Sequence, residues 1–393
     1  MTLFLTVGIV KGVPAQTAEP VWSPPVNLSN SGSATAATIL VVPNGPVIAV
    51  WKDEFDGFVF TRLVDGQWET PKAVDFPFAD SDNAPILLVD NVGSVHAFWL
   101  DQESSLFYSS ASLENFGTTN WSGTASISES VTVFTAAIDA QNDLSVMYIR
   151  SLNTADAPTG IYYRKRSAAG AAWVTPVLLY PSSYLRLLTA DQITMQLQAR
   201  TGSDGQTTLY AMWDNRPRGQ LFLSITPDAG TTWAEPVEIR GPGTSAAAPV
   251  AIGMTLTDDD QLLFLWQEKI SDTNCRQFYQ PFSLTGEAVN PPQVMLSEFP
   301  VCPEGNQLIP MADGRVILQT SVFNLNYLLV WNGDTWSEPQ IQSELSNFVN
   351  PDTLQSIDLK CLKTQAADNN HLFMLGCDND LGGDMWFTSR ELG

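Results

Sequence analysis

The sequence is poor in basic side chains. Its 393 residues include 19 Lys and Arg against 42 Asp and Glu, which gives a formal net charge of −23. A nucleic-acid-binding protein needs a basic surface that faces the phosphates, so this balance argues strongly against that class. It also disfavours binding to an anionic membrane surface. Scarce Lys and Arg do not suit a long helical protein, whereas 12 Trp and 25 Pro suit many short strands and turns.

Groups that carry common chemistries are scarce as well. There are two His residues, His96 and His371, and two isolated His do not make a metal site. We find no nucleophilic Ser or Cys constellation and no phosphate-binding loop.

Long apolar runs are missing, apart from a short one near the N-terminus. Leu3 to Val10 form this run, and Val13 and Ala15 provide a small-residue cleavage site before Gln16. The run is too short to span a membrane. We expect residues 1–20 to be a signal peptide, with a disordered tail as the alternative. The rest, residues 21–393, is then a single secreted or surface-exposed domain with no transmembrane segment.

Internal repeats organise the chain. The phrase Trp, two residues, Pro occurs as WSPP, WETP, WVTP, WAEP and WSEP, and degenerate copies bring the spacing to 46–60 residues. A second unit of alternating apolar residues lies between the phrases and occurs seven times, for example as SVHAFW at 94–99. The period is the size of one blade of a β-propeller.

Each repeat supplies four strands, with the Trp phrase at the start of the outer one. A lone four-stranded sheet cannot bury both faces, and radial stacking solves this. We therefore predict an all-β, seven-bladed β-propeller of four-stranded antiparallel blades. Residues 21–28 should supply the outer strand of the last blade and so close the ring. Six or eight blades would require a misread repeat, most plausibly around residues 296–370.

One hairpin carries a sharper motif. The stretch SITPDAGTTWAEPVEI at 224–239 is typical of two strands joined by a tight turn, in which Gly230 permits a positive φ and Asp228 accepts backbone N–H groups. It resembles the Asp box, the Ser/Thr-x-Asp-x-Gly-x-Thr-Trp hairpin of sialidase-like (BNR-repeat) propellers, at Thr226, Asp228, Gly230, Thr232 and Trp233. In that family the box lies opposite the active site, so the resemblance implies a structural role for these residues.

Sialidase chemistry itself is not expected. The family uses three Arg to hold the substrate carboxylate, but here no Arg precedes the first inner strand and the Arg-Ile-Pro signature is absent. The loops after the seven middle strands contain only Arg150, Arg216 and Arg218, beside two Lys and twelve acidic residues, a net charge of −7. Such a face should repel an anionic sugar.

An aromatic residue beside a charged one recurs where middle strands end. Flat aromatic faces next to carboxylates suit neutral sugars, although a Trp at this position can equally be interblade core and the acid a solvated loop residue. The candidate ligand-binding residues are Trp51, Trp99, Tyr148, Arg150, Trp213, Arg216 and Trp266. Carboxylates that could perform acid/base glycoside chemistry are Asp53, Asp101, Asp214 and Glu268.

The remaining candidates are a metal site and two disulfides. Asp378, Asp380 and Asp384 offer oxygen ligands of the kind calcium prefers, without the spacing of a recognised calcium loop. No other cofactor is expected. The four Cys suit two disulfides in an exported protein, Cys361 with Cys377 across one hairpin and Cys275 with Cys302, with free thiols as the alternative.

Three functions follow from these observations. The first is carbohydrate recognition on the acidic face without sialidase chemistry. The second is a glycoside hydrolase or lyase that uses the face carboxylates. The third is a protein-interaction scaffold. We expect a monomer that binds a glycan or a protein, and no nucleic acid.

Overall fold

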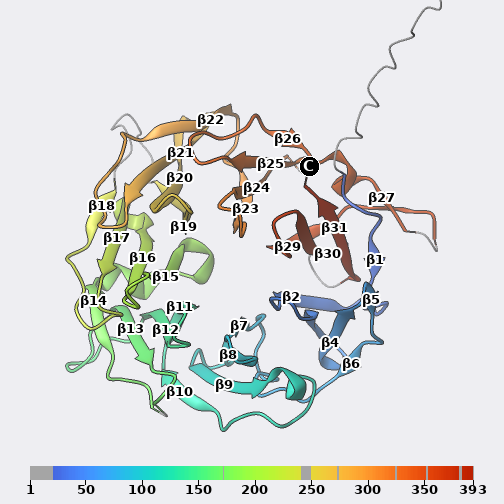
Figure 1. Ribbon diagram of the computed structural model, residues 1–393, viewed down its shortest axis with the longest axis horizontal. Helices are drawn as coiled ribbons and strands as arrows, with labels where there is room; N and C mark the ends of the chain where they lie inside the picture. The colour runs from blue at the N-terminus through green and yellow to red at the C-terminus, as the bar shows by residue number, and fades with distance from the viewer. Residues whose placement is uncertain are drawn as a thin grey trace, which may run out of the picture.

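The computed structural model describes residues 21–170, 172–239, 249–271, 274–323, 325–350, 353–379 and 383–392. Seven antiparallel sheets are arranged around a central axis as the blades of a propeller (Figure 1). The prediction of an all-β, seven-bladed ring is confirmed. The signal peptide predicted for residues 1–20 lies outside the described residues.

Each blade runs outward from an inner strand beside the axis. Blade 1 consists of β2 (Ala34–Val41), β3 (Val47–Asp53), β4 (Gly57–Val64), β5 (Gln67–Trp68) and β6 (Lys72–Ala73). Blade 2 consists of β7 (Ile86–Val89), β8 (Ser94–Leu100), β9 (Leu106–Ser112) and β10 (Ala125–Ser128). Blade 3 consists of β11 (Val131–Ile138), β12 (Leu144–Arg150), β13 (Gly160–Arg166) and β14 (Val177–Pro181).

Blades 4 to 6 repeat this order. Blade 4 consists of β15 (Met195–Thr201), β16 (Thr207–Asn215), β17 (Gln220–Thr226) and β18 (Val237–Ile239). Blade 5 consists of β19 (Val250–Leu256), β20 (Gln261–Ser271), β21 (Asn274–Ser283) and β22 (Gln293–Phe299). Blade 6 consists of β23 (Glu304–Pro310), β24 (Val316–Val322), β25 (Leu325–Trp331) and β26 (Gln340–Ile341).

Blade 7 joins the two ends of the chain. It contains β29 (Lys360–Ala366), β30 (His371–Cys377) and β31 (Met385–Glu391), and its outer strand is β1 (Val26–Asn27), with Val26 opposite Phe387. The predicted closure by the N-terminal strand is therefore confirmed. A small hairpin of β27 (Phe348–Val349) and β28 (Ser356–Ile357) precedes the blade and projects outward in Figure 1.

The outer strands begin later than the sequence suggested. In all five complete Trp phrases, a strand starts at the residue that follows the Pro, for example Val177 after Pro176 and Val237 after Pro236. Proline has no N–H to donate to a β-ladder, so the strand that follows can only pair beyond it. The Trp phrase is thus the turn into the outer strand rather than its first residues.

Seven clusters of buried apolar side chains hold the ring together. Each cluster lies between two neighbouring blades; one, for instance, joins Trp213 and Leu209 of blade 4 to Ile161 and Tyr163 of blade 3. Burial between blades is how single sheets with two apolar faces become stable. Short 3₁₀ turns are the only helical elements of the described residues, and none of these is long and apolar enough to cross a membrane.

The Trp233 hairpin forms the turn that its sequence predicts. Asp228 accepts hydrogen bonds from the hydroxyl groups of Thr226 and Thr232, both at 2.6 Å, and from the backbone N–H of Thr232 at 2.8 Å. Burial opposes its ionisation, but these bonds outweigh burial and lower the pKa of Asp228 to about 2. Gly230 has φ +87°, and Trp233 packs edge-on against Tyr163 of the preceding blade.

Candidate functional site

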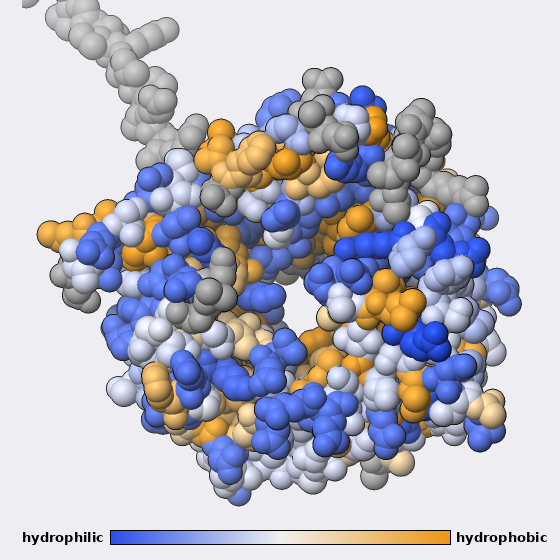
Figure 2. All heavy atoms as spheres, turned by 180° about the vertical axis from the view of Figure 1, so that it is seen from behind, coloured by the Kyte–Doolittle hydropathy of each residue, from blue (hydrophilic) through white to orange (hydrophobic). Residues whose placement is uncertain are grey.

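We define the loop face as the side of the ring that carries the turns from second to third strand and the connections from outer to inner strand. The opposite side is the turn face. Three clefts of the described residues are lined by loops and strand ends of the loop face, and a fourth is lined by the inner strands of blades 4 to 7 beside the central axis. Figure 2 shows the ring from behind relative to Figure 1, with a central opening and a mainly hydrophilic surface around it.

The aromatic residues proposed from the sequence are buried. The exposed fractions of Trp51, Trp99, Tyr148, Trp213 and Trp266 are between 0% and 3%, and each belongs to one of the interblade clusters. Their ring faces contact protein and are not accessible to a ligand in this structure. The alternative reading, that these side chains are interblade core, accounts for them, and their binding role gains no support here.

The loop-face carboxylates have structural partners. Asp53 accepts hydrogen bonds from Ser33 and from the N–H groups of Phe55 and Asp56. Burial opposes its ionisation, but these bonds and one from Ser31 outweigh burial, so the pKa of Asp53 lies below its usual value. A carboxylate held ionised in this way is a poor general acid.

Asp101 and Glu268 play comparable local roles. Asp101 accepts the N–H groups of Glu103 and Ser105 within its own turn, at 2.9 and 2.8 Å. Glu268 is 3% exposed and accepts the indole N–H of Trp266 at 3.0 Å. The structure thus accounts for both residues as supports of the loop face, and brings only Asp101 to the wall of a cleft.

Asp214 is the buried carboxylate that ties blade 4 to blade 5. It is fully buried and accepts the N–H groups of Thr194 and Ala251 as well as the Arg216 guanidinium, which lies 3.0 Å away. Burial raises the pKa of Asp214, although Arg216 and the backbone donors oppose this. A raised pKa suits an acid catalyst, but Asp214 lines none of the four clefts.

The three loop-face Arg side chains hold loops in place. Arg150 donates to the carbonyl groups of Leu152 and Ala157, and Arg216 donates to the Asp191 carbonyl and to the Thr194 hydroxyl. Arg218 lies over the Tyr184 ring at 5.9 Å. Each of the three Arg side chains therefore has its own local partners.

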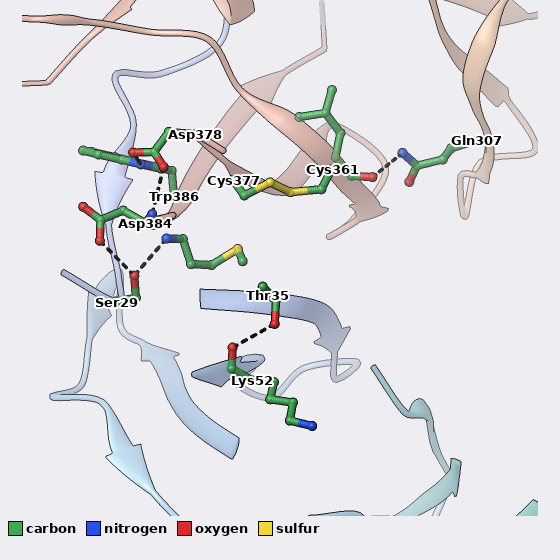
Figure 3. The surroundings of a disulfide bond; sticks show 11 residues. Ser29, Thr35, Lys52, Gln307, Cys361, Cys377, Asp378, Asp384 and Trp386 are labelled. Atoms are coloured by element: carbon green, nitrogen blue, oxygen red, sulfur yellow. Dashed lines mark hydrogen bonds between the residues drawn. A yellow bond between two sulfur atoms is a disulfide. The ribbon is translucent and has the colours of Figure 1, made fainter. Parts of the chain in front are cut away.

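The predicted metal ligands serve ring closure. Asp378 accepts the N–H of Asp384 and the indole N–H of Trp386, and Asp384 accepts the Ser29 hydroxyl (Figure 3). Asp384 also accepts the Asn27 amide and the N–H of Gly32. Asp380 lies outside the described residues. No group of three potential metal ligands occurs in the part of the chain that the structure describes.

Both predicted disulfides are formed. Cys275 pairs with Cys302, and Cys361 pairs with Cys377. The expected direct opposition of Cys361 and Cys377 is wrong in detail: a bulge places Lys360 opposite Cys377 and gives Cys361 a φ of +43°. The pairing survives because Cα atoms at 5.7 Å still permit a disulfide.

The largest of the four clefts lies between blades 6 and 7, and we call it the blade 6/7 cleft. It measures about 410 Å³, and its walls come from the first residues of β23 and β29 and from the β24–β25 hairpin. Polar and charged side chains in its lining include Glu304, Ser321, Asn326, Asp358, Lys360 and Lys363. Two of the seven Lys residues of the sequence are therefore here, and they balance two acids.

Both disulfides border this cleft. Cys302 precedes Glu304 by two residues, and Cys361 is itself part of the wall, as its position near Gln307 in Figure 3 illustrates. The Gln307 side chain bridges the two inner strands, because it donates to the Leu362 carbonyl at 2.7 Å and accepts the Thr364 N–H at 2.9 Å. The walls are thus fixed by covalent bonds and by a strand-to-strand bridge.

Asn326 is the most informative residue of this cleft. It is 7% exposed, and its side-chain amide makes no hydrogen bond within the described part of the chain. Neither amide atom is among the fully enclosed polar atoms that lack a partner, so the amide faces the open space of the cleft and is free to bind what enters it. Lys363 is exposed and likewise has no partner among the described residues.

A second cleft lies between blades 2 and 3, and we call it the blade 2/3 cleft. It measures about 400 Å³ and is lined by Asp82, Asp101, Gln102 and Ser104, together with residues of the next two blades. Asp82 pairs with Lys52 at 2.8 Å, and the hydrogen bond and charge of Lys52 lower the pKa of Asp82. No Lys or Arg lines this cleft, so it keeps the acidic character that the sequence predicted.

Sequence reasoning missed the blade 6/7 cleft because its residues do not repeat. Glu304 and Asn326 have no counterparts in the other blades that a periodic pattern would reveal. Two signals were available: the pair of lysines around Cys361 in a lysine-poor chain, and a Phe in the hairpin SVFNLN, where a turn residue was expected.

Comparisons with solved structures show what the fold is similar to. A polysaccharide lyase, described as an ulvan lyase bound to -[GlcA(1-4)Rha3S]-, has a TM-score of 0.54 at 12% identity and covers 94% of both chains. The polysaccharide lyase Uly1 has a TM-score of 0.56 at 12% identity, over 98% of this chain and 94% of its own. The lectin BP39L from Burkholderia pseudomallei has a TM-score of 0.53 at 13% identity, over 93% and 94%.

These likenesses establish the propeller fold alone, since the identities are low. No protein-family model and no curated protein matches the sequence. The sialidase-like family suggested by the hairpin at 224–239 is therefore not confirmed. The structural neighbours include lectins and polysaccharide lyases, and both classes act on carbohydrate.

Proposed function

We propose that this chain is an exported, monomeric carbohydrate-binding propeller that holds its ligand in the blade 6/7 cleft. The observation that carries the proposal is Asn326, a mostly buried residue whose side-chain amide lines the cleft and makes no hydrogen bond within the described part of the chain. An amide offers both a donor and an acceptor, which is what a sugar hydroxyl needs. Sialidase chemistry is not part of the proposal.

The size and lining of the cleft suit a sugar. Small-molecule sites typically enclose about 300–1,000 Å³, and this cleft measures about 410 Å³. Its carboxylates can accept hydroxyl protons, while the ammonium group of Lys363 and the hydroxyl of Ser321 can donate to sugar oxygens. Hydroxyl-rich ligands require such a dense polar lining.

The rigidity of the cleft supports binding rather than an incidental surface hollow. Its walls are held by two disulfides and by the Gln307 bridge. A preformed site loses less conformational entropy when the ligand binds, so more of the contact energy contributes to affinity. Disulfides also suit an oxidising, extracytoplasmic location.

The experiment is a glycan array with the full chain, read with calcium and with a chelator. We expect saturable binding that Asn326→Ala weakens by about tenfold or more. Gln102→Ala, in the blade 2/3 cleft, is the matched control and should leave binding unchanged. A loss with Gln102→Ala alone would move the site to the blade 2/3 cleft, and binding only with calcium would restore the metal hypothesis.

A blank array from folded protein would contradict carbohydrate binding. It would favour the third hypothesis, a protein-interaction scaffold. Strong binding to sialylated glycans that required Arg150 and Arg216 would contradict our exclusion of sialidase-type recognition.

A lyase is the second candidate, and the lysines of the cleft favour it. A polysaccharide lyase removes the proton next to a uronate carboxylate, and the bond to the neighbouring glycosidic oxygen then breaks to leave a C=C double bond. One of Lys360 and Lys363 could neutralise such a carboxylate as its ammonium ion, while the other, as a neutral amine, could take the proton and the departing glycosidic oxygen could take a proton from water. Incubation with uronate-containing polysaccharides, followed by the ultraviolet absorbance of the unsaturated product, tests this. Turnover that Lys363→Ala abolishes would make the chain an enzyme.

A further inference from the structure

The β24–β25 hairpin displays an aromatic side chain in an unusual backbone conformation. Val322 pairs directly with Leu325, and Phe323 follows Val322 in the short connection between them. Phe323 has φ +49° and is 65% exposed to solvent. Both properties need an explanation.

This position would favour a different residue if stability alone decided it. Two-residue hairpin turns with positive φ prefer Asn, Asp or Gly, because a bulky side chain clashes with the backbone in the left-handed region. Elsewhere in the described chain, the positive-φ positions without glycine hold mostly Asn, Asp, Ser or Ala, and Phe323 is the single aromatic residue among them. An exposed ring also gains no burial to offset that strain.

The turn is the outer end of one wall of the blade 6/7 cleft. Ser321 and Asn326, which line the cleft, are paired with each other immediately below the turn. Phe323 therefore follows the cleft-lining Ser321 by two residues in the same hairpin and is not itself part of the lining. The cleft itself supplies polar groups, and this ring supplies an accessible apolar surface beside them.

We propose that Phe323 is the stacking platform of the carbohydrate site. A pyranose ring has one face of C–H groups, which an aromatic ring can cover, and hydroxyl groups at its edge, which Asn326, Ser321 and the cleft carboxylates can bind. This inference rests on the proposed function and adds to it the residue that orients the sugar ring. It also explains why a strained, exposed Phe occupies the turn.

Another exposed aromatic on the loop face provides a matched control. Phe55 is 81% exposed in the β3–β4 turn of blade 1, where Gly57 supplies the positive φ of +72°. It lines none of the four clefts. Replacement of Phe55 removes a similar exposed ring without touching the blade 6/7 cleft.

The test compares Phe323→Asn, Phe323→Trp and Phe55→Asn in the full chain. The probes are methyl pyranosides of glucose, galactose, mannose, rhamnose and glucuronic acid, with binding measured by saturation-transfer NMR and calorimetry. We expect Phe323→Asn to lose at least tenfold in affinity while its melting temperature stays equal or rises. Phe323→Trp should retain binding, and Phe55→Asn should behave as the parent chain.

The outcomes separate this inference from the proposed function. If the parent chain binds a pyranoside and Phe323→Asn binds it equally well, the stacking role is wrong and the proposed function stands. If the parent binds and Phe55→Asn loses affinity like Phe323→Asn, the effect is not specific to the blade 6/7 cleft, and the inference fails. If the parent binds none of these probes and no glycan of the array, both proposals fall together.

Discussion

Asp384 accepts a hydrogen bond from Asn27 at 2.7 Å, although the two residues are 357 positions apart in the chain. The same carboxylate accepts Ser29 and the N–H of Gly32, so one side chain adds three hydrogen bonds to the backbone pairing that holds the N-terminal segment against blade 7. Ring closure therefore depends on β1 pairing and on a carboxylate that the sequence had suggested as a metal ligand.

Asp384→Ala should weaken this closure. It removes three hydrogen bonds to an ionised acceptor, and bonds of this kind contribute about 1.5–3 kcal/mol each, not additively. We expect the free energy of unfolding to fall by about 2–4 kcal/mol, measured by denaturant titration. Glu103→Ala, at an exposed turn residue of blade 2, is the control and should change little.

Calcium removal should leave the stability of this region unchanged. The four carboxylate oxygens of Asp378 and Asp384 all accept hydrogen bonds from protein groups, so a cation would have to displace those donors. We expect equal melting temperatures in excess chelator and in calcium. A rise with calcium that Asp378→Asn abolishes would show a metal site here.

The architecture could be predicted from the sequence because repetition copies it seven times. The Pro of each Trp phrase marks the start of an outer strand, and a misreading of one copy is corrected by the others. The pairing of Cys361 with Cys377 followed from the same hairpin, even though the bulge at Lys360 could not be seen in the pattern.

The candidate site could not be predicted in this way. Trp99 and Trp213 recur because they are interblade core, so repetition pointed to structural residues. Asn326 and Lys363 come from one blade each, and their proximity depends on how two blades meet. A cleft between repeats is a product of packing, and periodicity carries no information about it.

Gly230→Ala should be far more harmful than the same change at Gly333. Both residues have positive φ, at +87° and +101°, and the left-handed conformation costs an L-residue about 1–2 kcal/mol. A Cβ at Gly230 would also overlap the Tyr163 ring, whereas a Cβ at Gly333 has no neighbour within 4 Å. We expect about 1–2 kcal/mol of destabilisation at Gly333 and about 2–5 kcal/mol at Gly230.

Chemical denaturation of the two variants checks this comparison. Equal losses would mean that the Tyr163 ring moves aside at no cost. In that case the hairpin at 224–239 is less tightly packed than its hydrogen bonds indicate.

His96 should make the fold less stable in mild acid. It is 7% exposed, with Asp90 at 3.3 Å and the Tyr108 hydroxyl at 2.8 Å, and Arg166 also contacts Tyr108. Burial lowers the pKa of His96, although Asp90 opposes this shift. The unfolded chain then binds the proton more readily, so stability falls as pH drops below the unfolded pKa of about 6.5.

The variant His96→Gln isolates this effect because every other group titrates in both proteins. The difference in unfolding free energy between parent and variant should change by up to about 1.4 kcal/mol per pH unit below pH ~6.5. If this difference in unfolding free energy stayed constant between pH 7 and 5, Asp90 would be raising the pKa of His96 by as much as burial lowers it. His371→Gln, at a half-buried residue at the start of β30, is the control.

Removal of either disulfide should weaken glycan binding as well as the fold. The two bonds close loops with sequence separations of 27 and 16 residues, and the loss of each should destabilise the chain by about 3 kcal/mol. Because Glu304 and Lys363 lie next to these bonds, the walls of the blade 6/7 cleft should lose their fixed spacing. We expect the double replacements Cys275→Ala with Cys302→Ala, and Cys361→Ala with Cys377→Ala, to lower affinity while the chains remain folded.

A variant that is destabilised elsewhere separates the two effects. Gly333→Ala lowers stability without touching the cleft, so it should bind glycan as well as the parent chain at a temperature where both are folded. If the disulfide variants also bind as well as the parent, the bonds stabilise the ring only, and the cleft owes its shape to the Gln307 bridge. A loss of affinity confined to the disulfide variants would show that covalent closure prepares the site for its ligand.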